Sequence, residues 1–225
     1  MKLNPYKQDE IKKGLGQEAA KLVQNGMLVG LGTGTTATYF IDSLIERCRQ
    51  GLKIEVVSSS VRSQERAAKG GIPVIDMNRV VSIDLSIDGA DEIDPKNRMI
   101  KGGGGAHVRE KIVASASKLF VVIVDESKLV DCLGKFGLPI EILSFGLAST
   151  INKLEKLGYH GSVRKTADSL YITDNGNYIF DIHAPDRFEN PEKDHDAIVN
   201  IPGVVDSGFF LTFPQKCWWD TQTEL

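Results

Sequence analysis

Three short segments of the chain combine residue types that can bind an anion or move a proton. The first is Gly32-Thr-Gly-Thr-Thr36, which follows an apolar stretch and opens a helical pattern. Glycines let the backbone approach a ligand closely, threonine hydroxyls add donors, and N–H groups at a helix N-terminus attract anions. The ending of a Walker A loop is missing, and Ala37 occupies the third glycine position of a GxGxxG motif. We interpret the segment as a phosphate loop, with a tight strand-to-helix turn as the alternative.

The second segment, Asp88-Gly-Ala-Asp-Glu92, places two carboxylates three residues apart at the end of an expected strand. Asp88 and Asp91 can hold sugar hydroxyls or move protons, because the proximity of like charges raises the pKa of one carboxyl group. Taken alone, the segment is better interpreted as an acidic turn with an Asx cap.

The third segment, Lys101-Gly-Gly-Gly-Gly-Ala-His-Val-Arg-Glu110, contains a run of consecutive glycines. Such a run costs backbone entropy on folding, and close approach of its N–H groups to a small anionic ligand gives a reason to keep it. Lys101 supplies a mobile cation on one side, and Glu110 falls in the first turn of the following expected helix. A flexible, exposed linker is the alternative, although the strong helix and strand patterns on both sides argue against it.

Other kinds of catalytic centre find no support in the sequence. The four histidines have no metal-ligand spacing, and neither a GxSxG motif nor a catalytic-cysteine signature is present. Each histidine is expected to be a surface or structural residue, and for His107, which lies beside the glycine run, a contact with the ligand is the alternative. The three cysteines form no CxxC pair, so neither a disulfide framework nor a zinc ribbon is expected. We expect a cytoplasmic protein whose chemistry needs neither a metal ion nor an organic cofactor.

Composition narrows the possible partners. Hydrophobic residues make up 41% of the 225 residues and charged residues 25%, which is typical of a folded soluble protein. The net charge of −3 gives no general basic field, so nucleic-acid binding is not expected and an anionic ligand needs a local cluster of donors. The N-terminus lacks the apolar core of a signal peptide, and no apolar run is long enough to cross a bilayer, so no membrane partner is expected.

Helix and strand patterns alternate through the first half of the chain, as in a parallel α/β sheet. The expected helices are residues 8–25, the stretch ending at about Cys48, 61–69 and 106–118; the expected strands are 27–31, 53–58, 71–75, 81–88 and 119–125. The three segments fall where strands give way to loops, which is the edge at which open α/β sheets bind ligands. After Lys128 the pattern indicates a smaller α+β unit. Its expected elements are a helix over 146–157, a hairpin over 171–182 around an Asn-Gly turn, a helix near 192–200 and a strand over 204–211.

Together, the three segments resemble those of type A ribose-5-phosphate isomerases. The order and spacing of Asp88-Gly-Ala-Asp-Glu92, Lys101-Gly-Gly-Gly104 and Arg109-Glu110 make the resemblance highly specific, although no single segment does. The resemblance extends from about residue 8 to about residue 210. The further matching stretches are Gly30-Leu-Gly-Thr-Gly-Thr-Thr-Ala37, Val57-Ser-Ser-Ser60, Asp125-Glu-Ser-Lys128, Leu133-Gly-Lys-Phe136 and Ile201-Pro-Gly-Val-Val205.

The resemblance implies a fold and an activity. The fold class is α/β, with a Rossmann-like doubly wound sheet over residues 1–129 and 205–225 and a smaller inserted α+β domain over residues 130–204. The activity is the interconversion of ribose 5-phosphate and ribulose 5-phosphate in the non-oxidative pentose phosphate pathway, without a cofactor. A homodimer or homotetramer is expected, because the family commonly forms one.

The resemblance also implies roles for four side chains. Glu110 is similar to the general base that carries a proton between C2 and C1 through a cis-enediolate. Lys101 is expected to stabilise the negative charge that develops on the enediolate oxygens. Asp88 is expected to assist opening of the furanose ring, and Asp91 to position hydroxyl groups near the reacting carbons.

The family's substrate-binding positions fall on the same segments. Those expected to hold the phosphate end are Thr33, Gly34, Thr35, Thr36 and Lys128. The others are Asp88, Gly89, Ala90, Asp91, Lys101, Gly102, Gly103 and Gly104.

Residues 211–225 depart from the family's pattern, which usually ends in a strand and a Gly-Thr…Gly turn. Pro214 is expected to interrupt strand pairing. Trp218 and Trp219 are expected to pack against the core, with an exposed interaction patch as the alternative. Three other functions remain open from the sequence. They are a non-catalytic sugar-phosphate sensor, a coenzyme A transferase with Glu110 as a covalent nucleophile, and an isomerase of another sugar phosphate. A sensor of this kind normally carries a DNA-binding unit, and only about seven residues precede the first expected helix.

Overall fold

A computed structural model describes residues 5–183, 187–212, 215–219 and 223–224, with side chains for residues 6–183 and 187–212. The chain divides into two compact units. The first unit contains residues 1–90, 109–128 and 213–225, and the second contains residues 91–108 and 129–212. The domain boundaries expected from the sequence, 1–129 with 205–225 and 130–204, stay a prediction.

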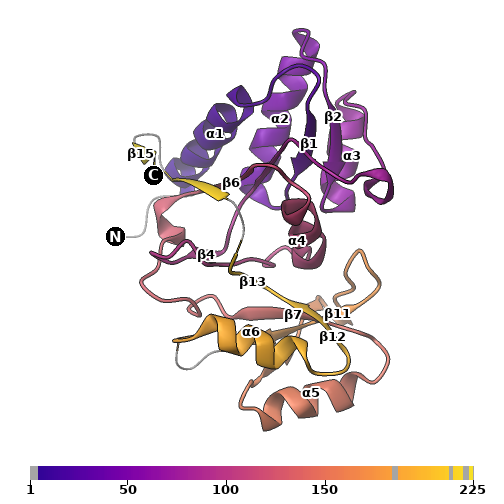
Figure 1. Cartoon of the computed structure of the whole chain (residues 1–225), viewed down its shortest axis with the longest axis vertical. Helices are drawn as coiled ribbons and strands as arrows, with labels where there is room; N and C mark the ends of the chain where they lie inside the picture. Colours follow the sequence, from indigo (N-terminus) through magenta and orange to yellow (C-terminus); the bar gives the residue numbers. More distant parts are fainter. Residues whose placement is uncertain (1–4, 184–186, 213–214, 220–222, 225) are drawn as a thin grey trace. The chain divides into compact units, whose positions relative to one another are not determined.

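The first unit is built on a parallel sheet (Figure 1). Its strands lie in the order β15-β14-β6-β3-β1-β2, and only the short β15 is antiparallel to its neighbour among the described strands. The strands are β1 (Leu28–Leu31), β2 (Glu55–Ser58), β3 (Leu85–Asp88), β6 (Phe120–Val124), β14 (Gln215–Trp219) and β15 (Thr223–Glu224). The helices are α1 (Pro5–Lys21), α2 (Thr35–Arg49), α3 (Val61–Lys69) and α4 (His107–Ser115), which enters this unit at residue 109.

Helices cover both faces of this sheet. Val56 packs with Leu15 of α1 and Phe40 of α2 in one buried cluster, whereas its neighbour Val57 packs with Val113 of α4 in another. Successive side chains of a strand point to opposite faces, so the two clusters lie on the two sides of the sheet. The expected α/β fold with a doubly wound parallel sheet is therefore confirmed.

The second unit contains an antiparallel sheet in the order β12-β7-β11-β8. Its strands are β7 (Leu138–Ile142), β8 (Gly161–Val163), β11 (Tyr178–Ile182) and β12 (Val204–Ser207), and its helices are α5 (Leu147–Lys156) and α6 (Pro191–Val199). Alternate residues of β7 share a buried cluster with Leu154 of α5 and Ile198 of α6. Both helices therefore pack on one face of the sheet, which is the smaller α+β arrangement that was expected.

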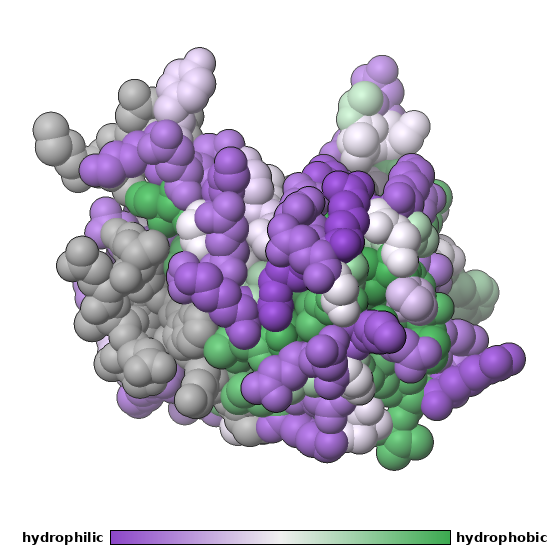
Figure 2. All heavy atoms as spheres, turned by 90° about the horizontal axis from the view of Figure 1, so that it is seen from above, coloured by the Kyte–Doolittle hydropathy of each residue, from purple (hydrophilic) through white to green (hydrophobic). Residues whose placement is uncertain are grey.

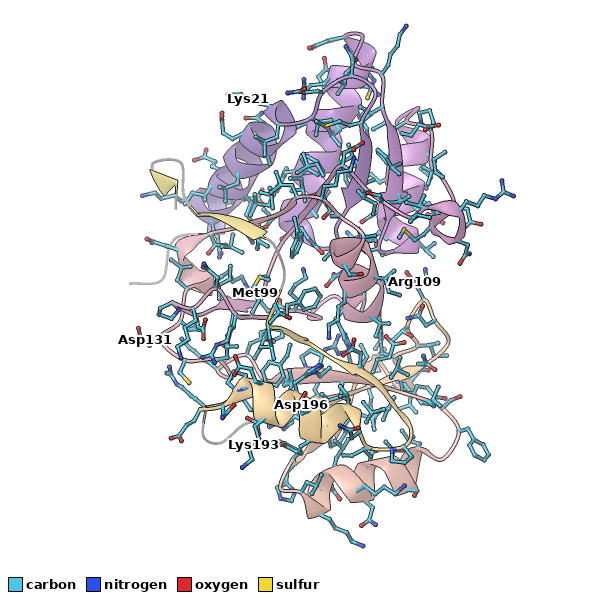
Figure 3. All side chains as sticks on the ribbon, viewed as in Figure 1. Lys21, Met99, Arg109, Asp131, Lys193 and Asp196 are labelled. Carbon is cyan, nitrogen blue, oxygen red and sulfur yellow. The ribbon has the colours of Figure 1, made fainter. Side chains whose placement is uncertain are left out.

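A second small sheet in this unit, in the order β13-β5-β4, carries two of the expected site residues at its ends. Its strands are β4 (Glu92–Ile93), β5 (Met99–Ile100) and β13 (Phe209–Phe210), paired antiparallel. Met99, labelled in Figure 3, is fully buried in β5. Asp91 directly precedes β4 and Lys101 directly follows β5. The remaining strands are the ribbon of β9 (Lys165–Thr166) and β10 (Ser169–Leu170).

Several expected elements differ in the structure. The predicted hairpin over 171–182 is wrong in its first arm, because residues 171–174 form no strand and β11 pairs with β7 and β8 instead. The Asn-Gly turn itself is present, with Gly176 at a φ of 79°. One carboxylate oxygen of the buried Glu141 explains the difference, because it accepts hydrogen bonds from Thr173, Asn175 and Asn177. Thr173 of the first arm is thus held by Glu141, and the N–H of Tyr171 donates to the carbonyl of Arg164, so the arm does not pair with β11 as a strand.

Two further strands are shorter than expected. Residues 71–75 make a single parallel bridge, between Val56 and Val74, next to Pro73, which has no N–H to donate. The strand expected over 81–88 is limited to β3, and the short 3₁₀ helix η1 (Met77–Arg79) precedes it. The strand expected over 204–211 is split into β12 and β13 at Gly208.

The C-terminal segment does add a strand to the first unit, because β14 pairs with β6 in parallel over residues 215–219. The expectations for Pro214 and for the side chains of Trp218 and Trp219 lie outside the described residues. None of the helices in the described part combines the length and apolar character needed to cross a membrane. Figure 2 shows hydrophilic side chains over much of one face, with hydrophobic ones gathered in patches among them.

Candidate active site

The strand order of the first unit creates a switch point at β1. The chain passes from β1 to β2 on one side and then to β3 on the other side. Loops that follow such strands diverge at the carboxyl edge of the sheet and leave a crevice there, which is where open α/β sheets bind ligands. The segments expected to carry function after β1, β3 and β6 therefore lie along one edge: Gly32 to Thr36, Asp88 to Ala90, and Asp125 to Lys128.

Gly32 and Thr33 are in direct contact with Asp88 at this edge. The N–H of Gly32 donates to the carbonyl of Ile87 at 2.9 Å, and the N–H of Thr33 donates to Oδ1 of Asp88 at 3.0 Å. The N–H of Gly89 donates to the same oxygen at 2.8 Å. A Cβ atom at position 32 would overlap the Asp88 carboxylate, so the close approach requires glycine there. The structure thus brings the first expected segment together with the first carboxylate of the second.

The N-terminus of α2 is suited to an anion. Gly34 precedes the helix with a φ of 98°, and no side chain of the described residues caps the helix there. The first turn, from Thr35, contains no acidic residue. The first N–H groups of a helix have no partner within it and carry a partial positive charge, so this end attracts an anion. The hydroxyl of Thr33 lies 2.9 Å from that of Ser59, which adds a polar contact on the side of β2.

Lys128 ends the 3₁₀ helix η2 (Glu126–Lys128), which follows β6 and is fixed by Asp125. The N–H of Lys128 donates to the carbonyl of Asp125 at 3.0 Å, and the N–H of Ser127 donates to its carboxylate at 3.0 Å. The amide of Gln8 donates to the other carboxylate oxygen at 3.3 Å. Burial raises the pKa of Asp125, but the hydrogen bonds from Ser127 and Gln8 and the charge of Lys12 outweigh it, so the pKa is lowered overall. A fixed anionic anchor therefore positions the half-buried Lys128.

Glu110 lies in the first turn of α4 and is only 5% exposed. Three residues further along the helix, Val113 packs where a side chain at Gly30 of β1 would lie. This contact sets the helix against the sheet. Arg109, labelled in Figure 3, precedes Glu110 on the same turn and is more exposed.

In the second unit, Asp91 is joined to the glycine run. Its N–H donates to the carbonyl of Ile100 at 2.9 Å, and its carboxylate accepts the N–H of Gly103 at 2.7 Å. A Cβ atom on Gly103 would lie 2.6 Å from the Asp91 carboxylate, so this contact requires glycine. The structure thus brings the second carboxylate of the Asp-Gly-Ala-Asp segment to the run that follows Lys101.

Lys101 is almost completely buried, with 2% exposure. Its N–H donates to the carbonyl of Gly208 at 2.9 Å, and its ammonium group lies 5.3 Å from the centre of the Phe210 ring. The field of a cation is stronger in a weakly polarisable interior than in water. This environment therefore suits a cation that must act on a nearby oxyanion.

The glycine run forms a hydrogen-bonded turn, so its interpretation as a flexible linker is wrong. The N–H of Gly105 donates to the carbonyl of Gly102 at 2.9 Å, and both residues have positive φ values, 79° and 102°. His107 is buried beside Gly102, and its Nε2 lies 3.3 Å from the carbonyl of Asp206. This arrangement fits the structural role expected for the histidine.

Sequence reasoning missed the contribution of Glu92. Its buried carboxylate accepts the N–H groups of Gly134 at 2.6 Å and of Phe136 at 2.5 Å. The ring of Phe136 is thereby held against Gly103, 2.9 Å from where a Cβ atom would lie. No local sequence pattern predicts this contact, because the partners are more than forty residues apart. Within the described residues, no three His, Cys, Asp or Glu side chains gather in a way that could hold a metal ion.

Comparisons with known proteins agree with this arrangement. A family model described as ribose 5-phosphate isomerase A (phosphoriboisomerase A) matches residues 55–224. The chain is 50% identical over 201 residues to ribose-5-phosphate isomerase A of Protochlamydia amoebophila, covering 89% of this chain and 87% of that protein. The structure of ribose 5-phosphate isomerase A from Methanocaldococcus jannaschii has a TM-score of 0.90 at 36% identity, covering 96% and 97%. That of ribose 5-phosphate isomerase from Plasmodium falciparum has a TM-score of 0.90 at 37% identity, covering 96% of each chain.

The environment of Asp125 predicts a pH-dependent contribution to stability. Its pKa in the folded state lies below the unfolded value of about 3.9, so its contribution is present above that value and is lost as the pH falls through the folded pKa. We expect Asp125→Asn to lower the free energy of unfolding at pH 7 by about 1–3 kcal/mol, because the amide offers the donors of Ser127 and Gln8 only one acceptor oxygen and no charge.

Urea unfolding of both proteins from pH 7 down to the acid range measures this effect. The gap between native protein and variant is expected to narrow as the pH falls. The exposed Asp131, labelled in Figure 3, provides the control Asp131→Asn, which is expected to match the native protein. A gap that stays constant down to the lowest pH would show that the Asp125 charge contributes nothing.

Proposed function

The chain belongs to the ribose 5-phosphate isomerase A family, and we propose that it interconverts D-ribose 5-phosphate and D-ribulose 5-phosphate by proton transfer through an enediolate. Family membership makes the chain an isomerase, so the sensor and the coenzyme A transferase are not retained. The observation that carries the proposal is the turn after Lys101. A buried cation is followed there by backbone N–H groups, one of which is bound to the Asp91 carboxylate. A sugar that develops an oxyanion needs such a set of fixed donors beside a group that can orient its hydroxyls.

Glu110 is the proposed general base, taking the proton from C2 of the open-chain aldose and returning it to C1. Moving a proton next to a carbonyl group requires a base that can reach both carbons. The low exposure of Glu110 supports this role, because a site that excludes bulk water protects the reactive enediolate from side reactions. Val113, one turn further along α4, packs against Gly30 of β1 and so sets the helix that carries Glu110 against the sheet.

Lys101 is the proposed partner of the enediolate oxygens. Its ammonium group is a compact point charge and can act on either of two adjacent oxygens as the hydroxyl proton moves from O2 to O1 and the charge shifts from O1 to O2. Burial strengthens this interaction, since the charges are not screened by water.

Asp88 and Asp91 are the proposed partners of the sugar hydroxyls. Asp88 is 4% exposed, and one of its oxygens is fixed by the N–H groups of Thr33 and Gly89. A carboxylate fixed in this way can accept a proton from the anomeric hydroxyl while the furanose ring opens. Asp91 is more exposed and is proposed to orient hydroxyl groups near the reacting carbons. The positions Gly89, Ala90, Gly102 and Gly104 are proposed to contact the substrate through their backbone.

The phosphate group is proposed to bind at the start of α2, to Thr33, Gly34, Thr35 and Thr36, with Lys128 as its cation. The absence of a side-chain cap among the described residues and the lack of an acidic residue in the first turn support this assignment. A cytoplasmic location, a role in the pentose phosphate pathway and a homodimeric or homotetrameric state remain proposals that rest on the resemblance.

The first experiment measures formation of ribulose 5-phosphate from ribose 5-phosphate by EDTA-treated protein, beside Glu110→Gln. The amide preserves the shape of the side chain but cannot take up a proton, so we expect kcat to fall by about 10²–10⁴-fold. Glu155→Gln changes an exposed glutamate of α5 and is expected to retain native activity. Native turnover with an equally active Glu110→Gln would remove the base assignment and leave the isomerase activity. A folded native protein without turnover would refute the proposed function itself.

A second experiment tests the phosphate contact of Lys128. We expect Lys128→Ala to reduce kcat/KM for ribose 5-phosphate by about 10–100-fold, mainly through KM, since a hydrogen bond to a charged group contributes about 1.5–3 kcal/mol. The residual activity on ribose without its phosphate is expected to be unaffected by the substitution. Lys153→Ala, at an exposed position of α5, serves as the control. Equal losses on both sugars would mean that Lys128 does not act on the phosphate.

A further inference from the structure

Two side chains outside the expected site hold the carbonyl oxygens of the glycine run. Nη1 of Arg164 donates to the carbonyl of Gly102 at 2.9 Å and to that of Gly103 at 3.1 Å. The hydroxyl of Tyr171 donates to the carbonyl of Gly104 at 3.2 Å. Three successive carbonyl groups are therefore bound by side chains of residues that lie much further along the chain.

Arg164 is itself fixed in the antiparallel sheet of the second unit. Its Nε and Nη2 donate to the two carboxylate oxygens of Asp181 in β11, at 2.8 and 2.5 Å. Its N–H donates to the carbonyl of Ile179 at 2.8 Å, and its side chain is 16% exposed. Such a bidentate ion pair holds the guanidinium plane in one orientation. The guanidinium also lies 5.8 Å from the centre of the Tyr171 ring, so the two donors support each other.

Peptide geometry turns these contacts into a constraint on the N–H groups. In a trans peptide the C=O of one residue and the N–H of the next point in opposite directions, and no described peptide bond is cis. Holding the carbonyls of Gly102 and Gly103 on Arg164 therefore directs the N–H groups of Gly103 and Gly104 away from it. The N–H of Gly103 does point to the other side, where it meets the Asp91 carboxylate at 2.7 Å.

The packing around Tyr171 shows that this arrangement is built into the turn. A Cβ atom on Gly105 would overlap the hydroxyl end of the Tyr171 ring, and the φ of 79° at this position also favours glycine. The ring thus occupies the space that a side chain at position 105 would need. Tyr171 is tied back to Arg164 by a backbone hydrogen bond of 2.9 Å.

We propose that Arg164, fixed by Asp181 and assisted by Tyr171, is a positioning residue for the isomerisation. It holds the N–H of Gly103 on the Asp91 carboxylate and directs the N–H of Gly104 to the same side of the turn, so that Asp91 and the Gly104 donor are aligned before charge develops on the sugar. Donors fixed in advance stabilise a developing oxyanion without a cost of reorganisation during the reaction. Arg164 acts through the turn and has no contact of its own with the reacting atoms. This inference rests on the proposed function, since it assigns part of the same site.

The test compares steady-state kinetics of Arg164→Ala with those of a matched control. Because misplacement of a positioned group by about 1 Å can cost about 10²-fold, we expect kcat to fall by roughly 10–100-fold while KM changes little. Arg98→Ala is the control. Arg98 is 13% exposed in the same unit and forms an ion pair with Asp94 at 2.6 Å, but its interactions do not involve the glycine run. Both variants are expected to lose thermal stability, and only Arg164→Ala is expected to lose kcat.

Chemical rescue separates positioning from a loss of stability. Guanidinium ion at low millimolar concentration can occupy the space left by the side chain and donate to the same carbonyls. We expect it to restore part of kcat in Arg164→Ala and to leave Arg98→Ala unchanged. Arg164→Lys keeps the charge opposite Asp181 but lacks the planar fork, so it is expected to fold and to show a reduced kcat. This variant decides the question if Arg164→Ala does not fold.

The kinetic results separate the failure of this inference from the failure of the proposed function. If native protein turns over ribose 5-phosphate and both Arg164 variants retain native kcat, the inference is overturned while the proposed function stands. The inference is also overturned if the variants raise KM alone, or if guanidinium ion restores nothing while Arg164→Lys has native kcat. Absence of turnover by the native protein refutes the proposed function instead.

Discussion

Carboxylates bound by backbone N–H groups recur at the ends of the strands in both units. Asp88 accepts the N–H groups of Thr33 and Gly89, Asp91 accepts that of Gly103, and Glu92 accepts those of Gly134 and Phe136. A buried charge is costly unless it is paired, and these backbone N–H groups supply part of the pairing. The same hydrogen bonds fix the loops that carry the N–H groups.

Glycine is what makes this arrangement possible. At positions 32 and 103 a Cβ atom would collide with the carboxylate that the neighbouring N–H group binds. At position 105 it would collide with Tyr171, and positive φ values at 102 and 105 close the turn. The four consecutive glycines look equivalent in the sequence, but those at positions 102, 103 and 105 are needed for different structural reasons. Its N–H groups point one way because Arg164 and Tyr171 hold its carbonyls on the other.

Much of the fold followed from local patterns. The spacing of Ala37, Phe40, Ile41, Leu44 and Ile45 predicts the buried face of α2, and the alternation of helices with short apolar strands predicts the parallel sheet. The segments proposed for function were also visible, because glycine runs and paired carboxylates are unusual at strand ends. Their residue-by-residue roles came from the family resemblance and not from spacing.

What could not be predicted depends on contacts between distant parts of the chain. The hydrogen bond from Arg164 to the carbonyl of Gly102 joins residues about sixty positions apart. No sequence motif marks the segment that contains Arg164. The hairpin expected around Gly176 failed for the same reason, since the buried Glu141 of β7 binds Thr173 of its first arm together with Asn175 and Asn177 around the turn. Turn chemistry predicted the turn correctly, but a long-range acceptor decided what its flanks would pair with.

The most direct test of proton transfer follows the isomerisation in D₂O by proton NMR. A carboxylic acid formed at Glu110 exchanges its proton with solvent in competition with the second transfer. Deuterium is therefore predicted to enter C2 of ribose 5-phosphate and C1 of ribulose 5-phosphate as the two sugars reach equilibrium. Isomerisation to equilibrium with both carbons still fully protonated would instead indicate direct transfer of a hydride. That result would contradict the enediolate and leave Glu110 without its proposed role.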